Sequence, residues 1–333
     1  MLVMGIETSC DETSVAVVED GRRILSNIIL SQIDKHAVFG GVVPELAARS
    51  HLEGIIQVID TALRQAGVGL KEIGLIAGTY GPGLIGGLLV GLSAAKAIAL
   101  STELPFIGVN HVEGHIYANF LAHQELAPPL LCLTVSGGHT NLIYMPEFAK
   151  YRILGQTRDD AAGEAFDKVA RVLGLGYPGG PYIDRLAVEG HPVIQLTQTD
   201  ALANTYDFSF SGVKTAVVNL VNSYKQKGRT IPQADLAASF QEYVVSTLAD
   251  RTFRAVESLG VNKVLLSGGV AANSQLRARF KELGGERGAQ IYYPPLELCT
   301  DNAAMIAACG YYRFCRCGPS GLDLPANPRL KLV

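Results

Sequence analysis

The stretch VMGIETSCDETSVAVV, residues 3–18, has apolar ends around a polar centre. Apolar runs on both sides of a short polar segment are typical of two strands joined by a turn. A related pattern occurs at residues 130–144, LLCLTVSGGHTNLIY, where one apolar run leads through a serine and two glycines into another. Each stretch is therefore predicted to form a hairpin with a polar tip.

A second kind of element follows each of these hairpins. In residues 75–83, LIAGTYGPG, an apolar run ends in glycines and leads into an apolar helix, and residues 264–273, VLLSGGVAAN, repeat this plan. Recurrence of two elements in the same order predicts an internal duplication, with two α/β lobes facing each other across a central ligand cleft. We expect an N-terminal lobe at residues 1–115, a connection at 116–129 and a C-terminal lobe at 130–333.

Composition narrows the class of protein. The chain has 333 residues, 48% of them hydrophobic, and a net charge of −3, which excludes disordered, collagen-like and coiled-coil chains. The uncharged stretch 73–95 contains a Gly-Pro-Gly turn that breaks a helix in lipid, so it is predicted to be a buried strand, a glycine turn and an apolar helix. The first residues include no basic segment, and none of the six cysteines forms a C-x-x-C pair. These features predict a cytoplasmic protein without a membrane span or a disulfide framework.

The sequence HVEGH, residues 111–115, places two imidazoles one helical turn apart. His111 and His115 then project from one face, at a spacing suited to a shared metal. Zincin proteases carry glutamate directly after the first histidine, whereas this chain has Val112 there and Glu113 on another face. The pattern thus disfavours a metalloprotease, and two histidines without a metal remain the alternative.

The sequence CTDN, residues 299–302, precedes an apolar helix. Thr300 or Asp301 is expected to cap that helix, because short polar side chains accept hydrogen bonds from its first amides. Alternatively, Asp301 supplies a carboxylate from the far lobe and completes a site of two histidines and one carboxylate. The sequence leaves both interpretations open.

Glycine-rich turns recur along the chain, at residues 81–83, 136–140, 178–181 and 267–273. Glycine lets backbone amides approach a phosphate closely, and a helix that starts there adds its dipole. Four such turns predict a nucleotide-sized ligand, although neither a dinucleotide-binding fingerprint nor a P-loop lysine is present. Asp167, and less strongly Asp184, are candidates to accept hydrogen bonds from ribose hydroxyls.

Nine segments, taken in order, resemble one family, the bacterial TsaD tRNA threonylcarbamoyladenosine transferases. The resemblance implies the two-lobed actin-like fold shared with sugar kinases and Hsp70, which agrees with the duplication. The segments are GIETSCDET (5–13), GGVVPE (40–45), GVNHVEGH (108–115), SGGHT (136–140), AGEAFDK (162–168), YPGGP (177–181), DFSFSG (207–212), SGGVAAN (267–273) and CTDN (299–302).

The resemblance also implies an activity, the transfer of threonylcarbamoyl from threonylcarbamoyl-AMP to the exocyclic amine of the adenine 3′ to the anticodon, in tRNAs that read codons beginning with A. It implies one divalent metal, Fe²⁺ in preference to Zn²⁺, on His111, His115 and Asp301. Implied partners are tRNA, a TsaB-like paralogue and a TsaE-like ATPase. The implied nucleotide contacts are Thr134, Val135, Ser136, Gly137, Gly138, Asp167, Gly180, Asp184 and Asn273.

Two acidic residues at the first hairpin tip, Asp11 and Glu12, are candidates to position the incoming amine or to accept its proton. Carboxylates at such a tip are otherwise solvated turn residues. An ATP-driven actin-like switch or scaffold is the alternative function, and a metalloprotease is a less favoured one.

Overall fold

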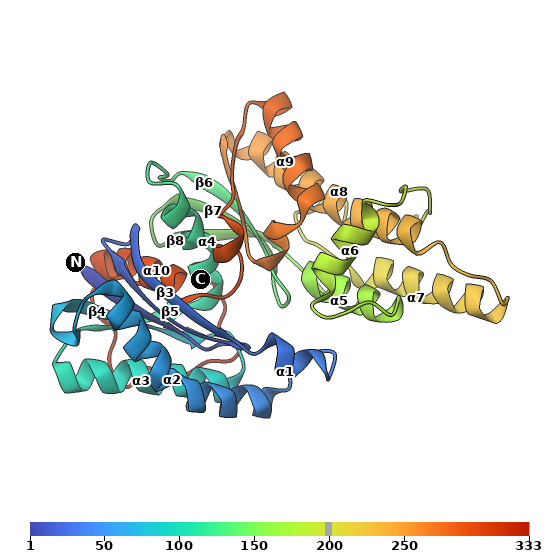
Figure 1. The fold of residues 1–333 in the computed structure, drawn as a ribbon. Coiled ribbons are helices and arrows are strands. Elements are labelled where there is room, and N and C mark those ends of the chain that lie inside the picture. Colours follow the sequence, from blue (N-terminus) through green and yellow to red (C-terminus); the bar gives the residue numbers. More distant parts are fainter. Residues whose placement is uncertain (197–201, 333) are drawn as a thin grey trace. The chain divides into compact units, whose positions relative to one another are not determined.

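The computed structural model describes residues 1–196 and 202–332, which group into two compact units (Figure 1). The first unit contains residues 1–128, 145–151 and 293–332, and the second contains the described residues of 129–144 and 152–292. The last forty or so residues therefore group with the N-terminal unit, whereas the sequence led us to expect them in the C-terminal lobe. The reason is the packing of their helix, described below.

The first unit is built on a five-stranded sheet in the order β3-β2-β1-β4-β5. β1 pairs antiparallel with β2, from Leu2 opposite Glu19 to Glu7 opposite Ser14, and parallel with β4. The predicted hairpin at residues 3–18 is thus confirmed. The strands are β1 (Leu2–Glu7), β2 (Glu12–Glu19), β3 (Arg23–Ser31), β4 (Ile73–Gly81) and β5 (Phe106–Asn110).

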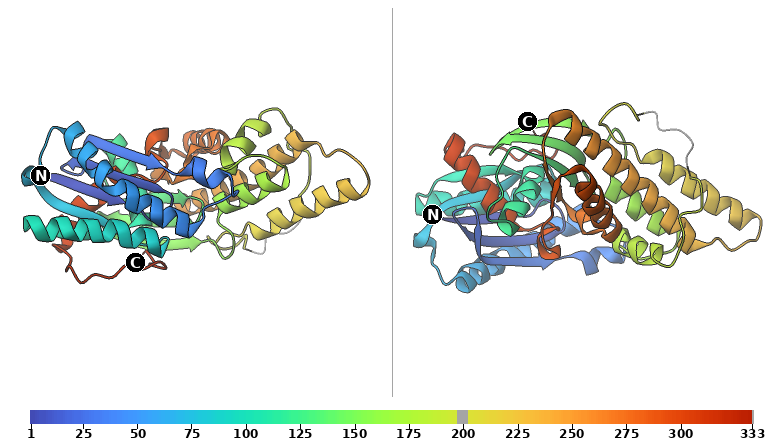
Figure 2. Two further views of the ribbon diagram at one scale, coloured as in Figure 1. Left: turned by 60° about the horizontal axis from the view of Figure 1, so that its bottom comes forward. Right: turned by 90° about the horizontal axis from the view of Figure 1, so that it is seen from above.

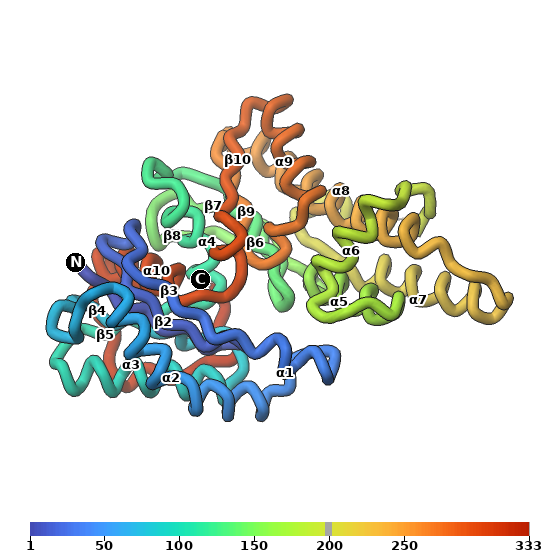
Figure 3. The backbone as a smooth tube through the Cα atoms, viewed as in Figure 1, coloured from blue at the N-terminus to red at the C-terminus, as the bar shows by residue number. Residues whose placement is uncertain are grey.

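Helices cover both faces of this sheet. Met4 and Ile6 of β1 share an apolar cluster with side chains of α2 and α3, which lie side by side (Figure 2). Gly5 faces the opposite way, onto α10, and a Cβ atom there would lie only 2.3 Å from the carbonyl oxygen of Ala303. The C-terminal segment therefore returns to the N-terminal strands (Figure 3). The helices are α1 (Ile33–Ala37), α2 (Pro44–Ala66), α3 (Ile85–Thr102), α4 (His111–Ala122) and α10 (Ala303–Cys317), with short 3-10 turns at Leu70–Glu72 and Leu296–Leu298.

The uncharged stretch 73–95 forms β4, a turn at Gly81–Gly83 and the first half of α3, as predicted. By length and composition α3 is the one described helix that is apolar enough to cross a membrane, and 33% of its apolar window is buried. It packs along β4 and α2, which is the arrangement of a helix that covers a sheet.

The second unit repeats the plan of the first. Its sheet has the order β8-β7-β6-β9-β10, which matches β3-β2-β1-β4-β5 strand for strand, and β6 pairs parallel with β9 as β1 does with β4. The duplication inferred from the sequence is confirmed. The strands are β6 (Leu130–Val135), β7 (Thr140–Glu147), β8 (Lys150–Gln156), β9 (Lys263–Ser267) and β10 (Gln290–Tyr292). The helices are α5 (Ala162–Val172), α6 (Gly179–Ala187), α7 (Ser211–Gln226), α8 (Gln233–Leu259) and α9 (Ser274–Arg287), with a 3-10 turn at Gly269–Ala272.

Candidate metal centre

The two histidines of the HVEGH motif lie in the first turns of α4, directly after β5. The helix begins there because the side chain of Asn110 caps it, accepting hydrogen bonds from the amides of Val112 (2.9 Å) and Glu113 (3.4 Å). His111 and His115 are both buried, and their ring centroids are 4.7 Å apart. The predicted pair on one helical face is therefore present.

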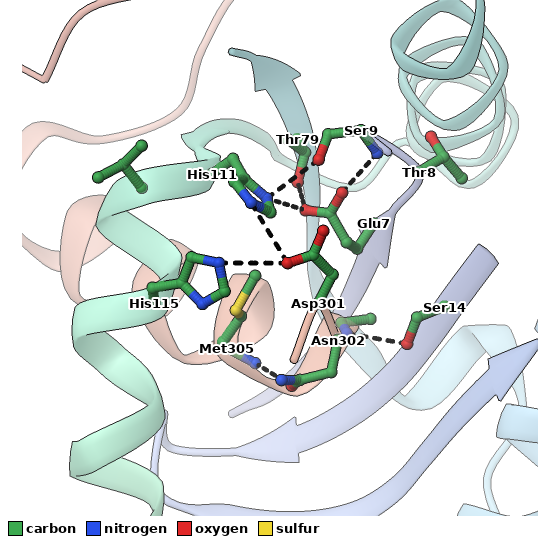
Figure 4. A network of polar contacts seen from close by, with 12 residues as sticks. Glu7, Thr8, Ser9, Ser14, Thr79, His111, His115, Asp301, Asn302 and Met305 are labelled. Atoms are coloured by element: carbon green, nitrogen blue, oxygen red, sulfur yellow. Dashed lines mark hydrogen bonds and ion pairs between the residues drawn. The ribbon is translucent and has the colours of Figure 1, made fainter. Parts of the chain in front are cut away.

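Asp301 reaches the same place from the loop before α10. Its Oδ1 atom lies 3.4 Å from Nε2 of His111 and 3.2 Å from Nε2 of His115 (Figure 4). The expectation that Thr300 or Asp301 caps α10 is wrong, because Asn302 is the cap and accepts from the amide of Met305 at 3.0 Å. The carboxylate of Asp301 is thereby left to face the histidines, and all three residues belong to the first unit.

This set of donors fits a divalent metal ion. One ligand atom from each of His111, His115 and Asp301 lies within 4.8 Å of the others. His115 is 1% exposed, and neither of its ring nitrogens has a hydrogen-bond partner among the described residues. Among these residues its Nε2 atom has only the ion-pair contact with Asp301, and a cation bound between these two groups would satisfy that buried nitrogen, which is costly to leave without a hydrogen bond. Two imidazoles and one carboxylate with open positions suit Fe²⁺ or Zn²⁺.

Acidic neighbours dominate the electrostatics of the centre. Burial alone would lower the pKa of His111, but the carboxylates of Asp301 and Glu7 raise it to about 9. Burial would likewise raise the pKa of Glu7, but His111 and the hydrogen bonds that Glu7 accepts hold that pKa below its ordinary value. In the metal-free protein the charge of the site is thus held by a protonated His111 between two carboxylates.

Sequence reasoning did not single out Glu7, which lies behind His111. Glu7 is fully buried, and its Oε2 atom lies 3.1 Å from Nδ1 of His111. The sequence feature that could have identified Glu7 is a carboxylate at the end of an otherwise apolar strand, LVMGIE. A carboxylate in such a strand is seldom buried without a charged partner, so it predicts one nearby.

Asp11 and Glu12 are not solvated, in contrast to the alternative we considered for a hairpin tip. They are only 7% and 8% exposed. Burial, then the charges of Asp301 and Asp11, raise the pKa of Glu12 to about 10. Both residues therefore belong electrostatically to the acidic surroundings of Asp301.

This raised pKa makes the stability of the metal-free protein depend on pH. Unfolded, Glu12 ionises near 4.5, whereas folded it keeps its proton until about pH 10. The folded state binds more protons in that window, so the free energy of unfolding falls as pH rises through it. We expect Glu12→Gln, which has no proton to lose, to be more stable than the wild type at pH 8–9 and similar to it near pH 4–5. Thermal unfolding of chelator-treated protein across this range measures the difference, and parallel curves for the two proteins would contradict it.

The predicted nucleotide-binding residues lie in the second unit, beginning with the turn after β6. Thr134 and Val135 are buried, and Oγ1 of Thr134 contacts Oγ of Ser267 at 3.0 Å, so the side chains of these two residues are not available to a ligand. Ser136 is half-buried, and Gly137 and Gly138 are exposed. Nothing lies within 4 Å of a Cβ added to either glycine. The turn is therefore open to a ligand.

The other predicted nucleotide contacts form two groups. Asp167 accepts from the amide of Gly179 at 2.7 Å, next to Gly180 at the start of α6. Asp184 accepts from the side-chain amide of Asn273 at 3.1 Å and also binds the amide of Ser274 at 3.0 Å. The structure thus brings Asp184 and Asn273 together through a hydrogen bond between their side chains.

Glu113 does not reach the metal centre. Its carboxylate accepts from the hydroxyl of Tyr151 and from Nη1 of Arg313, both at 2.7 Å. The glutamate that a zincin would use on metal-bound water is therefore bound elsewhere, which removes the geometric basis for a metalloprotease.

Comparison with known proteins gives a consistent result. Residues 23–308 match the profile of the TsaD family, described as tRNA N6-adenosine threonylcarbamoyltransferase. The chain is 53% identical over 339 residues to the tRNA N6-adenosine threonylcarbamoyltransferase of Caldicellulosiruptor bescii, covering 100% of this chain and 99% of that protein. It is 51% identical to the enzyme of that name from Clostridioides difficile, covering 100% and 98%.

One solved structure supports the assignment of the fold. HypF of T. kodakarensis superposes with a TM-score of 0.63 at 14% identity, covering 94% of this chain and 47% of that one. At this identity the likeness concerns the fold alone, and it places the chain in the actin-like class of α/β folds.

Proposed function

Because this chain belongs to the TsaD family of tRNA N6-adenosine threonylcarbamoyltransferases, we propose that it takes threonylcarbamoyl from threonylcarbamoyl-AMP and transfers it to tRNA at a metal centre. Membership in the family makes the chain a transferase that acts on tRNA. The observation that carries the metal-centred proposal is the convergence of His111, His115 and Asp301 in one unit.

The reaction needs no covalent enzyme nucleophile. The exocyclic amine of adenine attacks the carbamoyl carbonyl carbon, a C–N bond forms, the C–O bond to phosphate breaks, and AMP leaves with both bonding electrons. The amine loses one proton in the process. An acyl-adenylate is already activated, so the protein must chiefly hold the two reactants within about 3.5 Å in a productive orientation.

We assign His111, His115 and Asp301 as the residues that hold a divalent metal, Fe²⁺ in preference to Zn²⁺. When bound, such an ion supplies a Lewis acid for phosphate or carbamoyl oxygens. The absence of a hydrogen bond from the described residues to Nε2 of His115, which faces Asp301, and the mixed imidazole and carboxylate donors support this assignment.

For the adenylate we propose the backbone of residues 134–138 together with Asp167, Gly180, Asp184 and Asn273. The open turn at Gly137 and Gly138 suits a phosphate, and the carboxylates suit ribose hydroxyls. Asp11 and Glu12 remain our candidates for positioning the amine or accepting its proton. Burial supports a positioning role, since a carboxyl shielded from water holds a substrate group in a defined place. Because the pKa of Glu12 is raised to about 10, Glu12 is protonated near neutral pH and suits positioning, which leaves Asp11 as the candidate to accept the proton.

We propose a TsaB-like paralogue and a TsaE-like ATPase as partners, and a cytoplasmic location. Exposed apolar side chains on the neighbouring helices α2 and α3 support binding of a partner protein through helix packing. These side chains are Leu52, Ile56, Ile85 and Leu89. Exposed apolar side chains gathered on adjacent helices mark interaction surfaces. The net charge of −3 further favours partners that help hold a polyanionic tRNA.

Reconstitution tests the proposal. The chain would be combined with unmodified tRNA, threonine, bicarbonate, ATP, the synthase that makes the adenylate and the two partners, and nucleosides would be read by mass spectrometry. We expect threonylcarbamoyladenosine only when this chain is present. Omitting each partner in turn tests the partner assignment. If no threonylcarbamoyladenosine forms although the adenylate is made and a known transferase is active in parallel, the proposal is overturned in favour of an ATP-driven switch.

A further inference from the structure

Glu7 is a fully buried carboxylate at the end of β1, and hydrogen bonds from neighbouring residues hold both of its oxygens. Oε1 accepts from the amide of Ser9 at 2.5 Å, and Oε2 accepts from the hydroxyl of Thr79 at 2.6 Å. Thr79 lies on β4, the strand that pairs with β1. Two strands and a turn thus hold the carboxylate in one orientation (Figure 4).

The remaining partner of Glu7 is the first histidine of the metal centre. Nδ1 of His111 lies 3.1 Å from Oε2 of Glu7 and 3.0 Å from Oγ of Ser9. An ionised carboxylate only accepts hydrogen bonds, so Nδ1 carries the hydrogen in this contact. Nε2 is then the nitrogen that faces Asp301.

The second histidine has no equivalent support. Nδ1 of His115 has no hydrogen-bond partner within the described part of the chain. Both imidazoles face Asp301 through Nε2, but they differ at the other nitrogen, because Nδ1 of His111 is held by a carboxylate and Nδ1 of His115 has no such support from the residues described. Carboxylates that accept from the outer nitrogen of a ligating histidine fix its tautomer and strengthen it as a ligand.

We propose that Glu7 is a positioning residue that locks the tautomer and ring orientation of His111, so that this histidine is the preorganised ligand of the metal centre. The inference rests on the proposed metal site and goes beyond it by naming what orients one ligand. Glu7 is outside the donor set of His111, His115 and Asp301, because it contacts His111 at Nδ1 whereas Asp301 lies at Nε2.

Glu7→Gln tests this role. A glutamine amide cannot accept at both oxygen positions, so in either orientation its NH2 group meets another donor, the amide of Ser9 or Nδ1–H of His111. Both orientations therefore displace the group that holds His111. We expect the affinity of the metal-free protein for Zn²⁺ and Co²⁺, measured by competition with a chromophoric chelator, to fall about 10- to 100-fold. We also expect a changed visible ligand-field spectrum for bound Co²⁺, which a merely structural residue would not alter.

Glu113→Gln is the matched control. It makes the same chemical change at another fully buried glutamate, on α4 itself, whose carboxylate faces Tyr151 and Arg313 instead. Metal affinity and the Co²⁺ spectrum should match the wild type. Thr79→Val removes one anchor of Glu7 and leaves its contact with His111, so a smaller loss of affinity is expected there.

The outcomes separate the two proposals. If the wild type and Glu113→Gln bind metal and Glu7→Gln binds it equally well with the same spectrum, the role of Glu7 is refuted while the metal site stands. If the wild type binds no stoichiometric metal, the site itself fails. If Glu7→Gln does not fold, Thr79→Val decides, and an affinity equal to that of the wild type overturns the inference.

Discussion

Asp301→Asn should abolish stoichiometric metal binding and threonylcarbamoyl transfer together. The carboxylate oxygen that lies 3.2–3.4 Å from both histidines is replaced by a neutral group that is a poor ligand for a divalent cation. The loss of electrostatic stabilisation of the reacting carbonyl or phosphate should lower the transfer rate by ~100-fold or more. Metal content by atomic emission and product by nucleoside mass spectrometry measure the two effects.

The neighbour on the same loop provides the control. Thr300 is exposed, and its contact with Asn302 runs through its backbone carbonyl, which accepts from the side-chain amide at 2.8 Å. Thr300→Ala should therefore keep both metal and activity. Replacing His111 by alanine should repeat the result at Asp301, and full metal content with full activity in either variant would refute the proposed site.

Arg313→Met should lower the free energy of unfolding by about 3 kcal/mol, because it leaves a buried charge without its partner. Glu113 is 0% exposed, and Nη1 of Arg313 donates to its carboxylate at 2.7 Å. Tyr151 supplies the other contact at 2.7 Å, and a hydroxyl does not balance a charge. This pair joins α4 to α10, the helices on either side of the metal centre.

Replacing the other partner, Glu113→Gln, should lower the free energy of unfolding by less than Arg313→Met does. The side chain of Arg313 is 29% exposed and can reach water when Glu113 is replaced, whereas Glu113 cannot. The double variant Glu113→Gln, Arg313→Met should therefore recover most of the loss seen in Arg313→Met. Urea unfolding of the three variants gives the comparison, and a loss below about 1 kcal/mol for Arg313→Met would show that the pair contributes as little as an exposed one.

Some features of the site were predictable because they are local. The distance between His111 and His115 follows from the helical repeat, and the polar residues of CTDN predicted the start of α10. Which of those residues caps the helix was not predictable from pattern. Asp301 and Asn302 are both residue types that cap helices well. Asn302 is the cap in the structure, while Asp301 faces the two histidines of α4.

The surroundings of the site depended on contacts between distant segments. Asp11 and Glu12 have the composition of a solvated turn, yet they are buried beside Asp301, which lies almost three hundred residues further along the chain. Glu7 likewise meets His111 only because β1 and β5 flank β4 in one sheet. No periodicity within either segment encodes such a meeting.

The sequence by itself determined the repeated order of hairpin, strand, glycine turn and helix, because hydrophobic periodicity and turn residues act over a few positions. The actin-like fold was implied by the resemblance of the chain's motifs to one family. The sequence also determined the candidate ligands, since the chemistry of imidazole and carboxylate is a property of the residues themselves. Only the tertiary structure decided that residues 293–332 pack on the first unit, that Asp301 faces the histidines, and that Glu7 stands behind one of them. Burial and electrostatic coupling arise from the summed packing of segments far apart in the chain, so they exist only once the chain has folded.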